Sequence, residues 1–224
     1  MSVIQPSRTN PANVTQRKSY SRPLRLWHWL NFIVISGSLI TVLINSTITD
    51  DGTTSGIIKG ELQKQGSTVT DNQLRPAVHA LSDSVWAVHI YFGYALAALL
   101  AFRLVLEFFQ LADQKFIRQL KSAYQKFQTV EAERQVGRHE LTVKLIYGAF
   151  YLLLLIMALT GLFLAFEDAL AAYKSMRHTI KEIHGFCMYL IIAFIVVHLA
   201  GVYLAERKDG KGIVSDMING GTKQ

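Results

Sequence analysis

The stretch IKEIHGFCMYLIIAFIVVHLAGVYLAE, residues 180–206, decides the fold. Between its two histidines, His184 and His198, every residue is uncharged. An apolar run of about 20 residues is long enough to cross the ~30 Å hydrocarbon core of a bilayer as a helix. Because ionisable side chains are rare at membrane depth and usually have a function there, these histidines indicate a site within the membrane.

Three other apolar runs have a comparable length, and the four occupy residues 24–45, 85–109, 145–166 and 183–205. Of the 224 residues, 50% are hydrophobic and only 17% are charged, whereas soluble domains carry about a quarter of charged residues. We therefore expect an all-α membrane protein, a four-helix transmembrane bundle over residues 24–205. Polar tails at 1–23 and 206–224 would flank it.

Basic residues in the polar segments predict the orientation. The segments 1–25, 110–140 and 207–224 hold fifteen Lys and Arg residues, and the segments 46–84 and 167–182 hold six. Since cytoplasmic segments carry the excess of positive charge, both termini are expected in the cytoplasm. The net charge of +7 is thus explained by topology, and no nucleic-acid partner is expected.

Four of the seven histidines lie in the apolar runs: His28, His89, His184 and His198. Depth sorts them into His28 with His198 near the cytoplasmic face, and His89 with His184 near the outer face. On one helix, His184 and His198 are just under four turns apart, so they share a face at a separation of ~21 Å. We therefore expect two imidazole pairs at two levels.

Haem explains two imidazoles per level better than zinc does. Zinc sites are tetrahedral, and no cysteine or carboxylate stands beside these histidines to complete one. Two axial imidazoles fill the coordination of a haem iron and leave no open position, which suits electron transfer. We predict two haem b groups with His28, His198, His89 and His184 as axial ligands to iron. Proton relay or helix packing in a transporter or anchor is the competing reading, although the spans lack interrupted segments.

Two arginines are candidates for binding haem propionates. Arg103 follows His89 by 14 residues, which places it on the same face at the inner level, and Arg25 precedes His28 by one turn. A charge-assisted hydrogen bond to a propionate would explain either one. Snorkelling of Arg103 to the cytoplasmic interface is the alternative.

Other residues in or near the spans have two readings. Glycines in the spans could admit a flat macrocycle or serve ordinary helix contacts: Gly37, Gly93, Gly161 and Gly201. Tryptophans near the span ends are expected to be interfacial anchors: Trp27, Trp29 and Trp86. The remaining histidines are expected at the surface, with a role left open for the first: His79, His139 and His178.

Two connections are long. Residues 46–84 exceed an ordinary loop, and such loops are usually functional or disordered, so docking of an extramembrane partner is expected there. The cytoplasmic connection carries apolar residues at helical spacing, which predicts an amphipathic or a plain connecting helix: Phe116, Leu120, Tyr124 and Phe127.

Five motifs resemble the bacterial cytochrome b561 group: PLRLWHWLNF (23–32), VWAVHIYFGYALAALLAFRL (85–104), LTGLFLAF (159–166), residues 180–206 and GIVSDMING (212–220). Within this group, the chain is most similar to the cytochrome b subunit of membrane-bound nickel–iron hydrogenases. The gamma subunit of formate dehydrogenase is a related cousin. The resemblance covers residues 20 to 220.

The resemblance implies a subunit of the bacterial inner membrane that links an outward-facing oxidoreductase to the quinone pool. Its iron–sulfur subunit would exchange electrons with the outer haem, and menaquinone or ubiquinone with the inner one. The axial ligands would map onto His28, His89, His184 and His198. A stand-alone quinone oxidoreductase and a formate dehydrogenase-like gamma subunit stay open. The chain has no catalytic triad, phosphate-binding loop or carboxylate pair of its own, so it is expected to be an electron-transfer subunit, not an independent enzyme.

Overall fold

The computed structural model describes residues 21–109, 118, 121–122, 124–125, 134–207 and 212–220. In this part of the chain all regular structure is helical. The elements are α1 (Arg22–Thr47), α2 (Asp51–Lys64), α3 (Asp71–Phe109), α5 (Arg134–Ala165), the 3₁₀ helix η3 (Ala171–Met176), α6 (Arg177–Arg207) and α7 (Ile213–Asn219). The first twenty residues of the expected N-terminal tail, and all but Tyr124 of the residues used to predict a helix in the cytoplasmic connection, lie outside the described residues.

Four helices are long and apolar enough to cross a membrane, as the sequence predicts. The segments with that character are Arg22–Thr47, Asp71–Leu106, Leu141–Ala165 and Ala171–Arg207. Each helix extends past the apolar run that identified it. The reason is that hydrogen bonding continues a helix beyond the hydrocarbon depth wherever no residue terminates it.

The segment 46–84 is not an irregular loop, which corrects the sequence expectation. It forms α2 and the first turns of α3, joined by a short turn with Gly66 at φ 78°. Asp50 accepts a hydrogen bond from the backbone N–H of Thr53 at the start of α2. At the start of α3, Gln73 Oε1 accepts from the backbone N–H of Thr70 at 3.0 Å, the reciprocal contact of a capping box. We call α2 and the first turns of α3 the outer hairpin.

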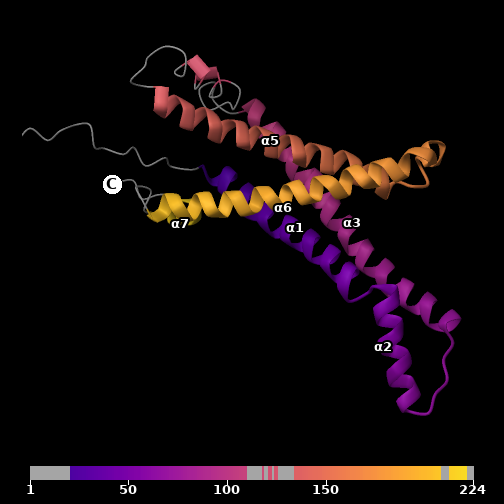
Figure 1. Cartoon of the computed structure of the whole chain (residues 1–224). Helices are drawn as coiled ribbons and strands as arrows, with labels where there is room; N and C mark the ends of the chain where they lie inside the picture. The colour runs from indigo at the N-terminus through magenta and orange to yellow at the C-terminus, as the bar shows by residue number, and fades with distance from the viewer. Residues whose placement is uncertain are drawn as a thin grey trace, which may run out of the picture.

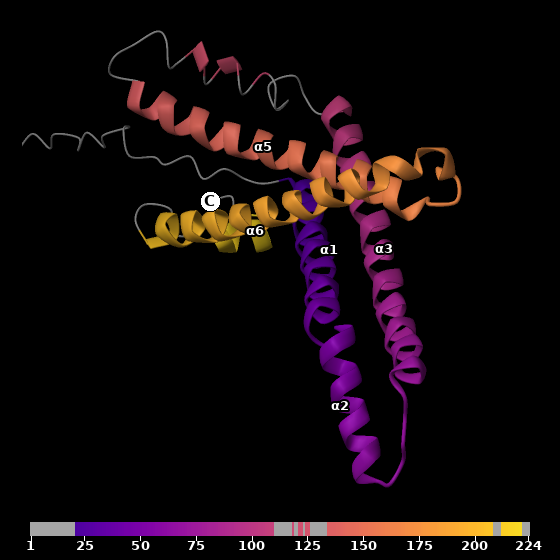
Figure 2. The same cartoon turned by 45° about the vertical axis from the view of Figure 1, so that its right-hand side comes forward.

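The four long helices form two crossing pairs. Helix α1 packs along α3, α5 packs along α6, and α3 makes the main contact with α5. Figures 1 and 2 show that the α1–α3 pair crosses the α5–α6 pair at a steep angle, with the outer hairpin projecting away from the crossing. The architecture therefore differs from a bundle in which all four helices run alongside one another.

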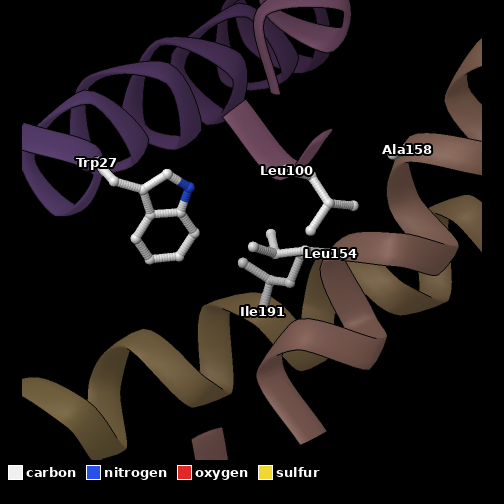
Figure 3. Packing of buried hydrophobic residues seen from close by; sticks show 5 residues of the cluster. All are labelled: Trp27, Leu100, Leu154, Ala158 and Ile191. Atoms are coloured by element: carbon white, nitrogen blue, oxygen red, sulfur yellow. The ribbon is translucent and has the colours of Figure 1, made fainter. Parts of the chain in front are cut away.

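A small core holds the crossing together. All four long helices contribute to it through buried apolar side chains (Figure 3): Trp27, Leu100, Leu154, Ala158 and Ile191. Leu154 has no exposed surface. Trp27 is only 6% exposed, and its indole N–H donates to the Leu99 carbonyl of α3 at 2.8 Å. The expectation that Trp27 is an interfacial anchor is therefore wrong. Trp29 and Trp86 are partly exposed, at 37% and 40%.

Candidate functional site

Helix α6 meets a histidine of another helix at each of two levels. The ring centres of His28 on α1 and His198 are 6.3 Å apart, and those of His89 on α3 and His184 are 6.4 Å apart. These are the couples that depth along the spans predicts. Helix α6 packs mainly on α5, whereas α1 and α3 pack mainly on each other.

In the outer pair, each imidazole contacts a threonine hydroxyl through Nδ1. Thr41 Oγ1 of α1 lies 2.9 Å from Nδ1 of His89, and Thr160 Oγ1 of α5 lies 2.8 Å from Nδ1 of His184. Ser38 Oγ is a second, longer contact of His89 at 3.3 Å. All four long helices therefore take part at the outer level.

A glycine allows α5 to approach the outer pair. A Cβ on Gly161 would lie 3.2 Å from Cε1 of His184, and one on Gly37 would collide with the Phe92 ring. Gly37 thus serves packing of α1 on α3, while Gly161 borders the site. Cβ atoms at Gly93 and Gly201 would meet no atom within 4 Å.

The inner pair has different surroundings. Nδ1 of His28 is buried without a hydrogen-bond partner. The His198 ring stacks on Phe194 with centres 5.8 Å apart and planes at 8°, while Trp29 meets the His28 ring edge-on at 5.4 Å. Both levels have an edge-on tryptophan contact, since Trp86 meets the His89 ring at 5.3 Å, and the hydroxyl contacts are what distinguish the outer level.

Arg25 connects the inner end of α1 to α7. Its Nη1 donates to the Ile218 carbonyl at 2.6 Å, near the C-terminal end of α7, where a cation is favourable. Trp29 Nε1 donates to the Met217 carbonyl at 3.3 Å. Gly220 leaves room for the guanidinium, since a Cβ there would come within 2.9 Å of its carbon. Nε of Arg25 is buried without a hydrogen-bond partner and could still donate to an acceptor. The contact of Arg25 with a haem propionate stays a prediction.

Arg103 is turned into the protein. It is 9% exposed, its Nε donates to the Tyr151 hydroxyl at 3.1 Å, and its guanidinium lies 5.6 Å from the centre of that ring. Snorkelling to the interface does not describe this burial. A buried cation beside a phenol is suited to receive an anionic group.

Of the other three histidines, His79 and His178 have exposed side chains. His79 is exposed in the first turns of α3, which confirms that this helix begins well before residue 85. His178 is exposed in the first turn of α6. His139 lies in α5, and its side chain is outside the part of the structure that is described.

The two pairs fit axial ligation of a haem iron. Two imidazoles on opposite sides of one metal have ring centres roughly 6 Å apart, from two metal–nitrogen bonds of ~2.0–2.1 Å and the radius of each ring. Among the described residues, no three His, Cys, Asp or Glu side chains converge as a metal-binding group. Each level therefore offers two imidazoles alone, the set that suits a metal whose other ligands come from a macrocycle.

Reasoning from sequence missed Thr41 and Thr160, and it named Gly161 only as one of four glycines that could admit a macrocycle. Hydroxyls in membrane helices usually bond to their own backbone, so they carry no signal by themselves. The neighbouring Thr160 and Gly161 stand in the LTGLFLAF motif, and they are the one local hint that α5, which has no histidine in its apolar run, borders the site.

The comparisons with known proteins agree with this geometry. The family model of prokaryotic cytochrome b561 matches residues 19–220, nearly the whole chain. Neither the curated proteins nor the solved structures gave a match. Four membrane-capable helices and paired imidazoles are what such a protein needs. The chain belongs to the prokaryotic cytochrome b561 family, and it is a membrane cytochrome b that transfers electrons through b-type haem.

Proposed function

We propose that the protein binds two haem b groups and carries electrons between two faces of a membrane. The supporting observation is the spacing of the two imidazole pairs, 6.3 Å at the inner level and 6.4 Å at the outer level. His28 and His198 would hold one iron, and His89 and His184 the other. Haem b supplies reversible one-electron oxidation and reduction, while the chain orients it and excludes water.

Two cationic side chains would receive haem propionates at the inner level. Arg103 is buried beside Tyr151, and Arg25 keeps a buried Nε for a further acceptor. A propionate would neutralise a cation that is otherwise costly to hold at this depth.

The electron donor is an outward-facing oxidoreductase, and the acceptor is the quinone pool. Resemblance to the cytochrome b of nickel–iron hydrogenases supports a hydrogenase, with its iron–sulfur subunit next to the outer haem and its catalytic subunit beyond. Menaquinone or ubiquinone would react near the inner haem. The chain then acts as the membrane subunit of a respiratory complex in the bacterial inner membrane.

The outer hairpin supplies a surface for that partner. It projects away from the crossing in both views (Figures 1 and 2). Its two arms are joined by an ion pair between Lys59 Nζ and Asp71 Oδ1 at 2.7 Å. It also leaves Ile57 and Leu81 at least half exposed, at 62% and 50%, which suits a docking surface outside the membrane.

Two related functions compete with this one: a stand-alone quinone oxidoreductase and a gamma-type subunit of a formate dehydrogenase-like complex. Purification from native membranes in mild detergent separates them. A nickel–iron enzyme that accompanies the chain supports the hydrogenase role. A molybdenum or tungsten enzyme supports the gamma-type role, and no stoichiometric partner supports the stand-alone role.

Haem stoichiometry tests the ligand assignment. We expect two haem b per chain in the purified protein, and about one after His184→Ala or His198→Ala, because one axial ligand of each centre comes from α6. His178→Ala is the matched control, since it removes an exposed histidine from the same helix. Two haems retained in the α6 variants would refute the assignment. A colourless protein would instead favour an anchor or transporter.

A further inference from the structure

The outer pair is arranged so that each imidazole is held by a helix that supplies no ligand at that level. Thr41 of α1 contacts His89 of α3 at 2.9 Å, and Thr160 of α5 contacts His184 of α6 at 2.8 Å. Both contacts reach Nδ1. They therefore leave the other ring nitrogen, Nε2, to face a metal.

The protons of these contacts can be placed by counting donors. A hydroxyl has one proton. Thr41 Oγ1 donates its proton to the Ser38 carbonyl at 2.6 Å, and Thr160 Oγ1 donates its proton to the Ile156 carbonyl at 2.6 Å. Each hydroxyl can then only accept from the imidazole. Both rings consequently carry their proton on Nδ1 and a lone pair on Nε2, the form that ligates iron.

We propose that Thr41 and Thr160 are positioning residues of the outer centre: by accepting the Nδ1 proton of His89 and His184, they fix ring orientation and strengthen both ligands. This inference rests on the proposed haem-binding function. An accepted hydrogen bond raises the basicity of a ligating imidazole. A more basic ligand stabilises the oxidised iron and lowers the reduction potential of the centre.

Differences between the two levels support the proposal. The planes of the outer rings are at 80°, whereas those of the inner rings are at 53°. In the inner pair, Nδ1 of His28 is buried without a hydrogen-bond partner. At the outer level each ring therefore has a hydroxyl contact at Nδ1, and His28 of the inner level has none.

Ordinary helix chemistry is the competing account. Serine and threonine in membrane helices bond to carbonyls three or four residues earlier without any further role. Thr47 and Thr142 do this: they donate to the carbonyls of Leu43 and Arg138 from exposed positions. Thr41 and Thr160 differ because each has an imidazole as second partner. The two exposed threonines therefore serve as matched controls.

Thr160→Val is the first test, because it removes the hydroxyl and keeps the branched shape. In a redox titration of the purified holoprotein, we expect the reduction potential of the outer haem to rise by ~59 mV. For a one-electron couple this is about a tenfold lower ratio of oxidised to reduced iron at a fixed potential. Its low-spin electron paramagnetic resonance signal should shift as well, because the ring is free to rotate. Thr142→Val should leave the reduction potential and the resonance signal at their wild-type values. Thr160→Ser, which keeps a hydroxyl, should also show the wild-type values.

The second test removes both hydroxyls near His89. Since Ser38 lies 3.3 Å from the same nitrogen, Thr41→Val is combined with Ser38→Ala. We expect a rise in the potential of the same haem, and an additive rise when Thr160→Val is included. Thr47→Val is the control within α1.

The outcomes separate this inference from the haem assignment. Wild-type protein without two haems would end the proposed function. If Thr160→Val binds two haems with an unchanged reduction potential and resonance signal, only the positioning role is overturned. The same conclusion follows if Thr160→Ser changes these readouts as Thr160→Val does. Loss of the outer haem in Thr160→Val, with its recovery in Thr160→Ser, would support the role.

Discussion

The ring of His184 lies against a glycine, and this contact determines how near α5 can come to α6. A methyl group on Gly161 would lie 3.2 Å from Cε1 of the imidazole, closer than ordinary carbon contacts of about 3.5–4.0 Å. The adjacent Thr160 holds the same ring through Nδ1. One short segment of α5 therefore determines both the position and the orientation of the His184 imidazole.

Gly161→Ala should displace the His184 ring and weaken the outer centre. We expect the variant to lose about 10-fold or more in haem affinity at that level, measured by reconstitution of apoprotein with haem, while the inner centre keeps its spectrum. Gly201→Ala on α6 is the control, since a Cβ there meets no atom within 4 Å. Unchanged outer haem affinity in Gly161→Ala would show that the ring can shift without cost.

The pairing of the histidines could be predicted from sequence, whereas the threonine contacts could not, for a physical reason. An imidazole at membrane depth has no ordinary partner there, so its presence alone indicates a function. The hydroxyl of Thr160 is satisfied by the Ile156 carbonyl of its own helix, so its presence indicates nothing. Trp27 was mistaken for an anchor because depth along a helix does not tell which face points inward.

At the level of helices, the crossing depends on a core of few side chains. Leu154 of α5 is fully buried between the pairs, while Leu152 on the same helix is 57% exposed. Lipid tails are as apolar as the core, so burial from lipid adds little and tight packing accounts for the stability. The stability of the helix assembly should therefore fall more when packed atoms are removed than when the same amount of apolar surface is removed.

Leu154→Ala should destabilise the helix assembly through the cavity it leaves. We expect the free energy of unfolding to fall by an amount near the lower end of the ~2–5 kcal/mol seen for buried leucines. The reason is that moving apolar atoms from lipid into the protein core contributes little. Detergent-induced unfolding followed by circular dichroism measures it. Leu152→Ala should cost little. An equal loss of unfolding free energy in both variants would mean that packing in the core at the crossing does not stabilise the assembly more than a lipid-facing side chain does.

Apolar runs located the four spans, but they could not show where the helices begin. Helix α3 starts at Asp71, and the Thr70–Gln73 capping contact was a readable signal for that start. The crossing of the pairs could not be derived, because periodicity reports the face of each helix and not the angle between helices.

At the level of the whole molecule, the charge distribution predicts which end of each helix pair faces the cytoplasm. Arg25 and α7 lie together at one end, where Arg25 donates to the Ile218 carbonyl. The outer hairpin projects from the opposite ends of α1 and α3 (Figure 2). A probe that cannot cross the membrane should distinguish these ends.

Ser67→Cys and Ser215→Cys report the two sides in a Cys187→Ala background. Both serines are exposed, and Cys187 is buried. In spheroplasts, a membrane-impermeant maleimide should label position 67 at once and position 215 only after permeabilisation. The reverse pattern would invert the orientation and place the outer pair on the cytoplasmic side.

The contact of Arg25 and Trp29 with α7 has a consequence for biogenesis. Helix α7 leaves the ribosome after all four spans, yet its carbonyls bind residues on either side of His28 in the first span. While the earlier spans insert, that end of α1 has not met its late partner. The contacts of Arg25 and Trp29 can therefore form only after α7 has been made, so this end of α1 is the last part of the helix to be fixed.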